Sequence, residues 1–335
     1  MRMLVTGAGG FIGRAAVAVA ASRGHRVRAM LRTGSPARHP DAWTEGSSIE
    51  VVRGDIRDPA SLREAVRGVD AVVHLAASMR GGDAEQTATT VAGTGRLLDA
   101  MAAEGAGRLV LVSSLAVYDV RGRPASEPVD ESCRLETCPE ERDAYCRARL
   151  AQEALVRDDA ARRGLDAVIL RAGVVYGPDR LWSPRIGLRP SPRLWLIPRP
   201  RDPLPLTFVD HCAEAIVLAA EREDVRGVAL NVVDDDPPSR IDHARRIRDR
   251  LAPRPVLVVV PWGLVRLAGT LADRLVAAIR GRRPGGGPLS ARRLAARFTP
   301  RPYANAGARA RLGWAPQASI DEVFRRIAER SVGGG

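Results

Sequence analysis

A glycine-rich turn directly follows the first apolar run of this chain, and it constrains the fold more than any other feature. The run Met3–Thr6 has the composition of a short buried strand, and the next residues read Gly7-Ala8-Gly9-Gly10-Phe11-Ile12-Gly13. Gly7 permits a tight turn, Gly10 lets a phosphate approach the backbone, and Gly13 allows a helix to pack closely on the strand. The free N–H groups at the start of that helix bind phosphates. The sequence therefore predicts a dinucleotide site formed by Gly7, Gly10, Phe11, Ile12 and Gly13.

Short apolar runs alternate with longer helical patterns through the first half of the chain. The predicted strands are Met3–Thr6, Val27–Leu31, Ile49–Val52, Ala71–Leu75, Leu109–Val112, Val168–Leu170 and Ala229–Val232. The predicted helices are Gly13–Ser22, Pro59–Val66, Thr87–Ala103 and Ala144–Arg163. Strands separated by helices form right-handed crossovers and a parallel sheet covered on both faces. The sequence thus predicts an α/β fold, a Rossmann-type doubly wound parallel sheet with a smaller C-terminal substrate lobe.

The character of the sequence changes after Tyr176. Seven prolines and six arginines fall within 178–203, a density that predicts a long exposed loop without regular elements. We expect residues 1–176, joined again by 204–233, to form the dinucleotide-binding domain, and 177–203 with 234–335 to form the substrate lobe. The lobe should contain two amphipathic helices. One face of the first is marked by Leu264, Leu267, Leu271, Leu275 and Ala278, and the packing face of the second by Ile320, Val323, Phe324 and Ile327.

The charge balance of the chain is strongly positive, with 52 residues of lysine or arginine, 39 of aspartate or glutamate and a formal net charge of +13. The sequence contains no lysine, so all of this charge is arginine, which indicates a compositional bias rather than selection for a nucleic-acid surface. Aromatic residues make up 4%, too few for platforms on which single-stranded bases stack. We expect a small-molecule substrate and no nucleic-acid partner.

The four cysteines are too few and too scattered for a disulfide framework or a zinc site, so we expect no metal. This usage fits a reducing cytoplasm, and we expect no signal peptide, because the first predicted strand begins at Met3. The longest apolar stretch, Pro261–Ile279, contains Arg266, Asp273 and Arg274 and is therefore not predicted to insert stably into a membrane. We expect a cytoplasmic location.

The end of the second predicted strand bears on the choice between the two nicotinamide cofactors. An acidic residue there would bind the ribose 2′-hydroxyl of NAD, but Leu31 occupies that place and Arg32 follows it. A guanidinium matches the 2′-phosphate of NADP, so the sequence favours NADP and leaves NAD as the alternative. The remaining predicted contacts are Asp55 and Ile56, which would flank the adenine, and Leu75, Ala76 and Ala77, after the fourth strand.

Several motifs occur in the order found in one known superfamily. They are Thr6-Gly7-x-x-Gly10-x-x-Gly13, Gly54-Asp55, His74-Leu75-Ala76-Ala77, Ser113-Ser114-Leu115-Ala116-Val117-Tyr118, Tyr145-x-x-x-Arg149, Leu170–Pro178, Leu206–Asp210 and Leu312-Gly313-Trp314-x-Pro316. With these motifs the chain resembles the extended short-chain dehydrogenases/reductases, which include the NAD-dependent epimerase/dehydratase, dihydroflavonol reductase and hydroxysteroid dehydrogenase families. The likeness runs almost end to end. It is specific for the superfamily and not for a substrate.

The resemblance implies that two hydroxyl groups bind the reacting oxygen of the substrate. Ser114 takes the position of the family's serine, and Tyr145 takes that of its acid/base tyrosine. A free phenol has a pKa near 10, so it needs a neighbouring cation to act at neutral pH. The family supplies a lysine four residues after the tyrosine, whereas this chain has Arg149. Arginine keeps the charge and can bind a ribose hydroxyl, but it does not deprotonate.

The same resemblance implies the remaining site residues. Tyr145 and Arg149 would contact the cofactor together with Ala172 and Val174, and substrate contacts are expected from Ser114, Tyr118, Tyr145, Arg180 and Arg185. Cys146 and His211 are interpreted as packing and capping residues rather than as a nucleophile and a base. A homodimer is expected through the two long helices 87–103 and 144–163, as is usual for the superfamily.

Departures from the family pattern leave alternatives open. Thr90 stands where an asparagine of the proton relay is expected, and residues 172–175 lack the asparagine that nucleotide-sugar members commonly have. The leading hypothesis is an NAD(P)-dependent oxidoreductase that interconverts a secondary alcohol and a ketone of a small metabolite. One alternative is a nucleotide-sugar epimerase or dehydratase with transient hydride transfer. The other is an NADP(H)-binding sensor or scaffold with weak catalysis.

Overall fold

A seven-stranded sheet forms the centre of the molecule. A computed structural model describes residues 1–32, 43, 48–77, 85–86, 88–124, 126–279, 290–299 and 301–332. Within them the sheet has the strand order β11-β6-β5-β4-β1-β2-β3, and every pair of neighbours runs parallel. Its strands are β1 (Arg2–Thr6), β2 (Arg26–Leu31), β3 (Ile49–Arg53), β4 (Ala71–His74), β5 (Arg108–Ser114), β6 (Asp166–Ala172) and β11 (Val228–Val232). The predicted Rossmann-type fold is confirmed.

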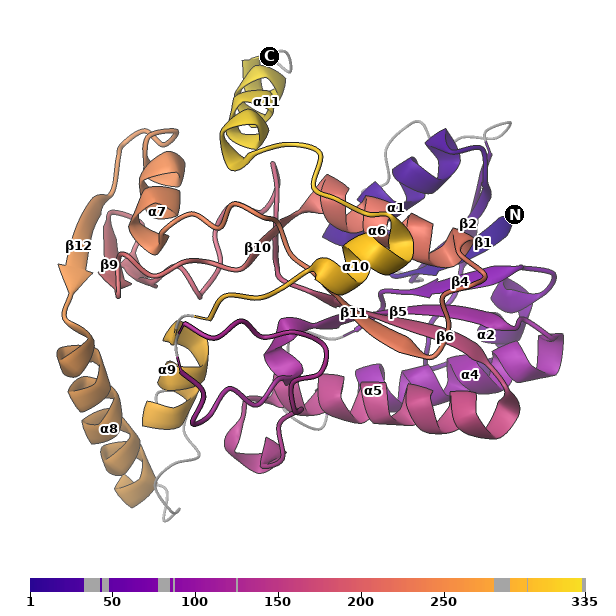
Figure 1. The fold of residues 1–335 in the computed structure, drawn as a ribbon, viewed down its shortest axis with the longest axis horizontal. Helices are drawn as coiled ribbons and strands as arrows, with labels where there is room; N and C mark the ends of the chain where they lie inside the picture. The colour runs from indigo at the N-terminus through magenta and orange to yellow at the C-terminus, as the bar shows by residue number, and fades with distance from the viewer. Residues whose placement is uncertain are drawn as a thin grey trace.

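Helices cover both faces of this sheet (Figure 1). One face carries α1 (Phe11–Ser22) and α6 (Val209–Glu221), which pack against each other. The other face carries α2 (Pro59–Val66), α4 (Gly93–Glu104) and α5 (Ala144–Arg163). The expected extent of the helix at 87–103 is met by α4 together with the preceding π-helical turn η1 (Ala88–Ala92), while residue 87 lies outside the described residues.

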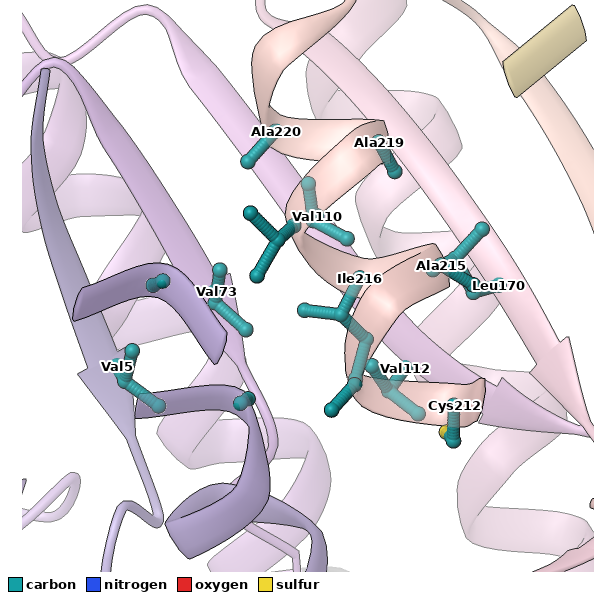
Figure 2. Packing of buried hydrophobic residues seen from close by; sticks show 14 of the residues in the cluster. Val5, Val73, Val110, Val112, Leu170, Cys212, Ala215, Ile216, Ala219 and Ala220 are labelled. Carbon is teal, nitrogen blue, oxygen red and sulfur yellow. The ribbon is translucent and has the colours of Figure 1, made fainter. Parts of the chain in front are cut away.

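The two layers of core follow from the alternation of side chains along each strand. Met3 and Val5 of β1 join the cluster under α1 and α6, whereas Leu4 joins the cluster under α2, α4 and α5. Figure 2 shows how Ile216 of α6 lies among the valines Val110 and Val112 of β5. Small residues along α6, Ala215, Ala219 and Ala220 among them, let this helix approach the sheet closely.

Local sequence signals set the ends of the helices. Asp58 caps α2 through hydrogen bonds from the N–H groups of Ala60 and Ser61, and Asp143 caps α5 by accepting from the N–H of Cys146. Helices α4 and α5 both end at a glycine in the left-handed conformation, Gly105 with φ 73° and Gly164 with φ 69°. These caps place the first turn of α5, which carries Tyr145, at the carboxyl edge of the sheet.

The strand order reverses between β1 and β4. From β1 the chain builds outward to β2 and β3, and from β4 it builds outward on the other side to β5, β6 and β11. The carboxyl ends of β1 and β4, Thr6 and His74, are paired in register. Open α/β sheets bind ligands at such a switch point, so the topology directs the search for a site to this edge.

The rest of the chain forms two small sheets and five helices within the described residues. A parallel pair joins β7 (Val174–Tyr176) to β10 (Leu206–Phe208), and a three-stranded sheet has the order β12-β9-β8. Its strands are β8 (Leu188–Ser191), β9 (Leu194–Pro198) and β12 (Val256–Val260), and the helices are α7 (Arg240–Arg248), α8 (Trp262–Ile279), α9 (Ala291–Phe298), α10 (Ala306–Leu312) and α11 (Ile320–Val332). Short 3-10 turns lie at η2 (Leu115–Val117) and η3 (Pro139–Glu141).

The prediction of a featureless exposed loop at 178–203 is wrong. Strands β8 and β9 form a hairpin there, and Ile186, Trp195 and Ile197 are buried in the core of this region. Two of the prolines stand within these strands: Pro190 lies in β8, an edge strand, and Pro198 ends β9. Proline is compatible with an edge strand because its missing N–H leaves no inner hydrogen bond broken.

The two amphipathic helices predicted near the C-terminus are both present. Val323, Phe324 and Ile327 of α11 pack into the same core cluster as Tyr176 and Trp195, as the pattern predicted. Helix α8 forms as well, although its leucine face does not pack against the described residues. No helix in the described part of the chain combines the length and the apolar character needed to cross a membrane.

Candidate active site

The glycine turn brings the backbone of β1 against that of β4. Gly7 has φ +71°, and a Cβ at this position would lie 2.9 Å from the backbone nitrogen of Ala76. A Cβ at Gly13 would lie 2.2 Å from the carbonyl oxygen of Gly7. Helix α1 starts at Phe11 with no side-chain cap and no acidic residue in its first turn. Its first N–H groups therefore remain available, and the turn fits the pyrophosphate of a dinucleotide.

The residues predicted to line the cofactor lie around this turn. Phe11 and Ile12 are half-buried at the start of α1, and Leu75, Ala76 and Ala77 are half-buried directly after β4. The side chain of Ile56 packs against the start of α4, where a Cβ at Gly93 would lie 2.6 Å from Ile56 Cδ1. These contacts leave a surface of small and apolar groups beside the glycine turn, which suits an adenosine group.

Two arginines surround Asp55 at the outer end of this surface. Arg57 forms an ion pair with Asp55, with 2.7 Å between the Arg57 terminal nitrogen and Asp55 Oδ2. This hydrogen bond lowers the pKa of Asp55, and the charge of Arg32 lowers it further. Arg32 itself is exposed directly after β2. The site thus presents an exposed cation, Arg32, within electrostatic range of the Asp55 carboxylate.

The predicted catalytic residues come from two neighbouring elements. Ser114 ends β5, is half-buried, and accepts a hydrogen bond from the N–H of Ala116 at 3.2 Å. Tyr145 lies in the first turn of α5, and its neighbour Cys146 donates from Sγ to the carbonyl oxygen of Ala116 at 3.1 Å. The contact at Ala116 fixes the start of α5 beside the end of β5. The structure therefore holds the segments of Ser114 and Tyr145 together.

Arg149 lies one turn further along α5 and is buried beneath Tyr145. Its Cζ lies 5.4 Å from the centroid of the Tyr145 ring, a cation–π arrangement. One terminal nitrogen donates to the carbonyl oxygen of Val112 at 3.0 Å and to Gln152 Oε1 at 2.7 Å. Its Nε is buried and has no partner within the described residues. This unpaired donor beside the tyrosine fits a ribose hydroxyl at the nicotinamide end of the cofactor.

A chain of buried polar groups continues from Arg149 into the sheet. Gln152 Nε2 donates to Thr94 Oγ1 at 2.8 Å, and the same oxygen lies 2.9 Å from His74 Nε2. His74 Nδ1 lies 2.7 Å from Thr6 Oγ1, directly before the glycine turn. Burial, with a further contribution from the charge of Arg149, lowers the pKa of His74 to about 3. The histidine is therefore neutral at physiological pH and connects the two hydroxyls as one donor and one acceptor.

This network contains the site residues that the sequence analysis missed. The sequence analysis placed Thr90 at the position of the family's proton-relay asparagine. Thr90 is buried, and its backbone oxygen accepts a hydrogen bond from Thr94 Oγ1 at 2.5 Å. The side chain in contact with Gln152 belongs to Thr94 instead. Isolated polar residues in apolar patterns, such as His74 in β4, were the only signal in the sequence. Their partners lie 20 to 68 residues away, so the pairing itself carries no local pattern.

Tyr118 does not reach the site, which corrects its predicted role in substrate binding. Its side chain is 1% exposed, and burial raises its pKa to about 12. Its hydroxyl donates to Asn231 Oδ1 at 2.7 Å and accepts from a terminal nitrogen of Arg171 at 2.8 Å. Arg171 in turn pairs with the buried carboxylate of Glu153 on α5 at 2.8 Å. Tyr118 therefore belongs to a buried structural cluster that joins β6, β11 and α5.

The two arginines predicted to bind substrate lie in different places. The Arg180 guanidinium lies over the ring of Phe11, 5.8 Å from its centroid, beside the start of α1. Burial raises the pKa of the Cys146 thiol and the charge of Arg185 opposes this shift, so Arg185 lies within electrostatic range of the first turn of α5. Arg297 of α9 lies near both Arg185 and Asp143. Burial, reinforced by the charge of Arg185, lowers the pKa of Arg297, while Asp143 opposes this shift.

The remaining predicted residues occupy mixed positions. Ala172 is buried at the end of β6 opposite Ser114, and Val174 is half-buried at the start of β7. Burial raises the pKa of the Cys146 thiol to about 12, which agrees with a packing role. His211 Nδ1 contacts Asp234 at 2.9 Å, and its Nε2 accepts from the backbone N–H groups of Gln317 and Ala318. It holds the segment before α11 in place.

Comparison with known proteins agrees with this geometry. The profile of the NAD dependent epimerase/dehydratase family matches residues 3–189. The chain is 30% identical to the 2-alkyl-3-oxoalkanoate reductase of Stenotrophomonas maltophilia, over 99% of this chain and 100% of that protein. It is 33% identical to cinnamoyl-CoA reductase 1 of Oryza sativa subsp. japonica over 52% of this chain and 53% of that protein.

Solved structures share the fold across the whole chain. A short-chain dehydrogenase/reductase superfamily protein from Agrobacterium tumefaciens with bound NAD has a TM-score of 0.71 at 24% identity, covering 99% of this chain and 98% of that chain. A UDP-galactose 4-epimerase has a TM-score of 0.69 at 21% identity, covering 99% of each. The profile match over more than half of the chain and the full-length reductase relative show that the chain belongs to the NAD dependent epimerase/dehydratase family and is an NAD(P)-dependent enzyme of the extended short-chain dehydrogenase/reductase type.

Proposed function

We propose that this enzyme uses NADP(H) to interconvert a ketone and a secondary alcohol on a small substrate that carries a negative charge near the carbonyl. The observation that carries this proposal is the pair of half-buried arginines, Arg185 and Arg297, beside the first turn of α5. Neither guanidinium forms an ion pair within the described part of the chain. The two guanidiniums together with the one nearby carboxylate, that of Asp143, leave a net positive charge in a partly desolvated place, which favours the binding of an anion.

The full-length relative supports the choice of substrate class. Its name describes reduction of a 2-alkyl-3-oxoalkanoate, in which a ketone lies two carbons from a carboxylate. In the present enzyme, Arg185 and Arg297 would bind the carboxylate, and Tyr145 would act on the ketone two carbons away. We therefore infer a 3-oxo acid, or its 3-hydroxy counterpart, as the substrate class.

The residues of this chain have separate tasks in that reaction. The bound nicotinamide supplies the hydride for reduction or accepts it in the reverse direction. The Ser114 hydroxyl donates a hydrogen bond to the carbonyl oxygen, and the Tyr145 phenol transfers a proton to that oxygen. The Arg149 guanidinium lies over the ring of Tyr145 and supplies a cation to the phenolate that remains. Because arginine does not release its proton, Tyr145 regains a proton through a ribose hydroxyl or water.

We propose NADP rather than NAD because Arg32 and Arg57 place positive charge beside the expected 2′-phosphate. The proposed contacts of the cofactor are the glycine turn, Asp55, Ile56, residues 75–77, Ala172 and Val174. Arg180, which lies over Phe11 at the start of α1, is reassigned from the substrate to the pyrophosphate of the cofactor. Substrate binding is assigned to the lobe formed by 177–203 and 234–335, since Arg185 and Arg297 come from these two parts.

Kinetics with a matched pair of substrates tests the charge requirement. We expect the wild-type enzyme to reduce a 3-oxo acid with a higher kcat/KM than the methyl ester of the same acid. Arg185→Ala and Arg297→Ala should each lower kcat/KM for the acid by about 10- to 100-fold, the equivalent of one charge-assisted hydrogen bond, and change that for the ester little. Arg193→Ala, on the turn between β8 and β9, is the control because that arginine is exposed. Equal activity on acid and ester would contradict the proposal.

The same cations also fit the diphosphate of a nucleotide sugar, which is the substrate type of the second candidate function. An epimerase or dehydratase returns the hydride and consumes no cofactor, so net oxidation of NADPH separates the two functions. A change in a UDP-sugar without net change in NADPH absorbance would favour the second candidate.

We further propose that two copies associate through α4 and α5 in the cytoplasm. The packing of these helices side by side on one face of the sheet supports this proposal, because a two-fold dimer uses the same surface on both copies. Size-exclusion chromatography with light scattering measures the molar mass of the protein in solution. A monomer at all protein concentrations would contradict this proposal.

A further inference from the structure

Exposed apolar side chains are concentrated in one stretch of the chain. Of the eleven large apolar residues that are exposed in the described part of the chain, ten lie between residues 251 and 279, and the other is Met1. Scattered exposed apolar residues are ordinary, but a concentration of this kind marks a surface that contacts something. The ten residues are Leu251, Val256, Val258, Val259, Leu264, Leu267, Leu271, Leu275, Val276 and Ile279.

Helix α8 presents two opposite faces. Its buried residues, Val265, Gly269, Asp273 and Ala277, recur every four positions and form the face toward the protein. The exposed large residues Leu264, Leu267, Leu271, Leu275 and Ile279 lie on the opposite side of the helix, and we call this set the α8 apolar face. At 3.6 residues per turn it spans about 120° of the helix. Figure 1 shows α8 at the outer edge of the molecule, directly after β12.

The exposed fractions show that this face is not a partly covered core. Leu264, Leu267, Leu271 and Leu275 are between 55% and 63% exposed, and Ile279 is 75% exposed. On β12, Val256 and Val259 are 62% and 52% exposed. Leaving this much apolar surface in water is unfavourable by roughly 25 cal/mol for each Å².

The exposed leucines of α8 do not fit one narrow coiled-coil seam. A heptad register through Leu264, Leu271 and Leu275 uses Ala268 and Ala278 at the other seam positions and leaves out Leu267 and Ile279, whereas a register through Leu264, Leu267 and Leu271 reaches Arg274 next. The exposed large residues therefore form an apolar face that is wider than either seam. A wide face with cationic flanks is typical of helices that lie in the interface of a bilayer.

The exposed charged residues of the stretch that carries the α8 apolar face, residues 250–279, are all positive. From Arg250 to Ile279 the sequence contains one acidic residue, Asp273, and its side chain is 8% exposed on the inner side of α8. Arg254, Arg266 and Arg274 are exposed in the same stretch. Arg193 is exposed as well, and its carbonyl oxygen accepts from the N–H of Val256 at 2.8 Å. This surface is complementary in charge to anionic lipid.

We propose that the α8 apolar face docks this enzyme on the surface of an anionic phospholipid bilayer. Helix α8 lies parallel to the membrane, its leucines enter the boundary between headgroups and acyl chains, and the nearby arginines contact the phosphates. The enzyme remains peripheral, because the helix does not span the bilayer. Helix α9 packs against the inner side of α8 through Leu294 and Phe298 and also carries Arg297. Docking therefore brings the proposed substrate site close to the lipid.

Flotation of the purified full-length protein with vesicles tests this proposal. One set of vesicles contains phosphatidylcholine alone, and a second contains phosphatidylcholine mixed with phosphatidylglycerol. We expect the protein to float with the second set and to bind the first far more weakly. Leu267→Gln/Leu271→Gln should raise the lipid concentration needed for half-maximal binding by at least about tenfold, since two leucines leave the apolar phase. Leu267→Met/Leu271→Met keeps the apolar character and should bind like the wild type.

A second pair of variants separates charge from apolar contact. Arg254→Gln/Arg274→Gln should weaken binding to the anionic vesicles by about fivefold for each arginine. Arg63→Gln/Arg67→Gln removes two exposed arginines from α2 and its end, at the other side of the molecule in Figure 1, and should leave vesicle binding unchanged. Thermal melts check that both arginine variants are folded. We expect them to be, because Arg63, Arg67, Arg254 and Arg274 are all exposed.

Three results would overturn the proposal. The first is a wild-type protein that floats with neither set of vesicles. The second is equal flotation of the Leu267→Gln/Leu271→Gln variant and the wild type, which would place the contact elsewhere. The third is a dimer that the same variant dissociates in the absence of vesicle binding, which would assign the α8 apolar face to a second copy of the chain.

Discussion

The guanidinium of Arg149 lies over the ring of Tyr145, with 5.4 Å between Arg149 Cζ and the ring centroid. The same guanidinium donates to the carbonyl oxygen of Val112 in β5 and to Gln152 on its own helix. Its position is therefore fixed from two sides, by the sheet and by α5. An enzyme that replaces the family's lysine with arginine keeps a cation at this place without keeping a group that can pass on a proton.

Substitutions at the two residues separate charge from proton transfer. Tyr145→Phe should lower kcat by about 10²- to 10⁴-fold, the range typical for loss of a general acid. Arg149→Lys should retain or raise kcat, because it restores an amine with the same charge. Arg149→Met should lower kcat, because the phenolate loses its neighbouring cation. Steady-state kinetics with NADPH measures all three, and unchanged turnover in Tyr145→Phe would show that the family mechanism does not operate in this protein.

Gln152 is predicted to be a positioning residue for Arg149. Gln152→Leu removes the acceptor of the Arg149 guanidinium and the donor to Thr94, so kcat should fall by about 10- to 100-fold through misplacement of the cation. Gln152→Glu keeps the acceptor and should recover most of kcat. The KM for the substrate should change little in both variants. A loss that is confined to KM would contradict this role.

Cofactor preference should depend on Arg32. Arg32→Ala is expected to weaken NADPH binding by about 1.5–3 kcal/mol, the size of a charge-assisted hydrogen bond, and to leave NADH binding nearly unchanged. Arg26→Ala, at the opposite end of β2, is the matched control. Fluorescence titration of both cofactors gives the two dissociation constants. An equal loss of binding free energy for NADPH and NADH would contradict the assignment of Arg32 to the 2′-phosphate.

Stability should decrease in mild acid because of His74. Its pKa falls from 6.5 in the unfolded chain to about 3 in the folded protein, so the unfolded state binds more protons between these two values. The free energy of unfolding therefore falls as the pH drops through this window, by about 1.4 kcal/mol for each pH unit from this group. Between roughly pH 6 and pH 4.5, the free energy of unfolding of His74→Gln should fall by about 2 kcal/mol less than that of the wild type. Urea unfolding at several pH values measures this difference, and parallel curves would contradict it.

Tyr118 should contribute to stability and not to substrate binding. Tyr118→Phe leaves Asn231 Oδ1 without its hydroxyl donor and one nitrogen of Arg171 without an acceptor, so it should destabilise the protein by about 1–3 kcal/mol. Its KM should equal that of the wild type. A raised KM at unchanged stability would restore the role in substrate binding that the sequence suggested.

Local patterns were sufficient for the central sheet and the glycine turn. The strands around Val5 and Val110 are uniformly apolar, and the glycines precede a helix at the spacing that a phosphate requires, so both features can be recognised within a few residues of sequence. Helix α6 was not among the predicted helices. Nine of its residues, from Val209 to Ala220, are buried. A short run that is this apolar cannot be told from a buried strand by its pattern alone.

Other features depend on contacts that no local pattern contains. Gln152 is an ordinary helical residue until the fold places Thr94 beside it, and Tyr118 looked like a site residue because only the fold buries its hydroxyl. Helix α8 shows the opposite limit. The leucines from Leu264 to Leu275 have the spacing of a buried face, and the sequence does not tell whether the chain itself covers them.

The pairing of β12 with β9 has a consequence for how new specificities arise in this enzyme. In the chain, β11 of the central sheet lies between β9 and β12. In space, β9 and β12 pair directly, with Val258 opposite Leu196. A graft of residues 177–203 from a relative would leave β12 without its matching neighbour. The register of this pair depends on both strands. Residues 177–203, which carry β9, and the segment of β12 therefore have to be exchanged together. Successful chimeras will be those that carry both stretches from the same parent.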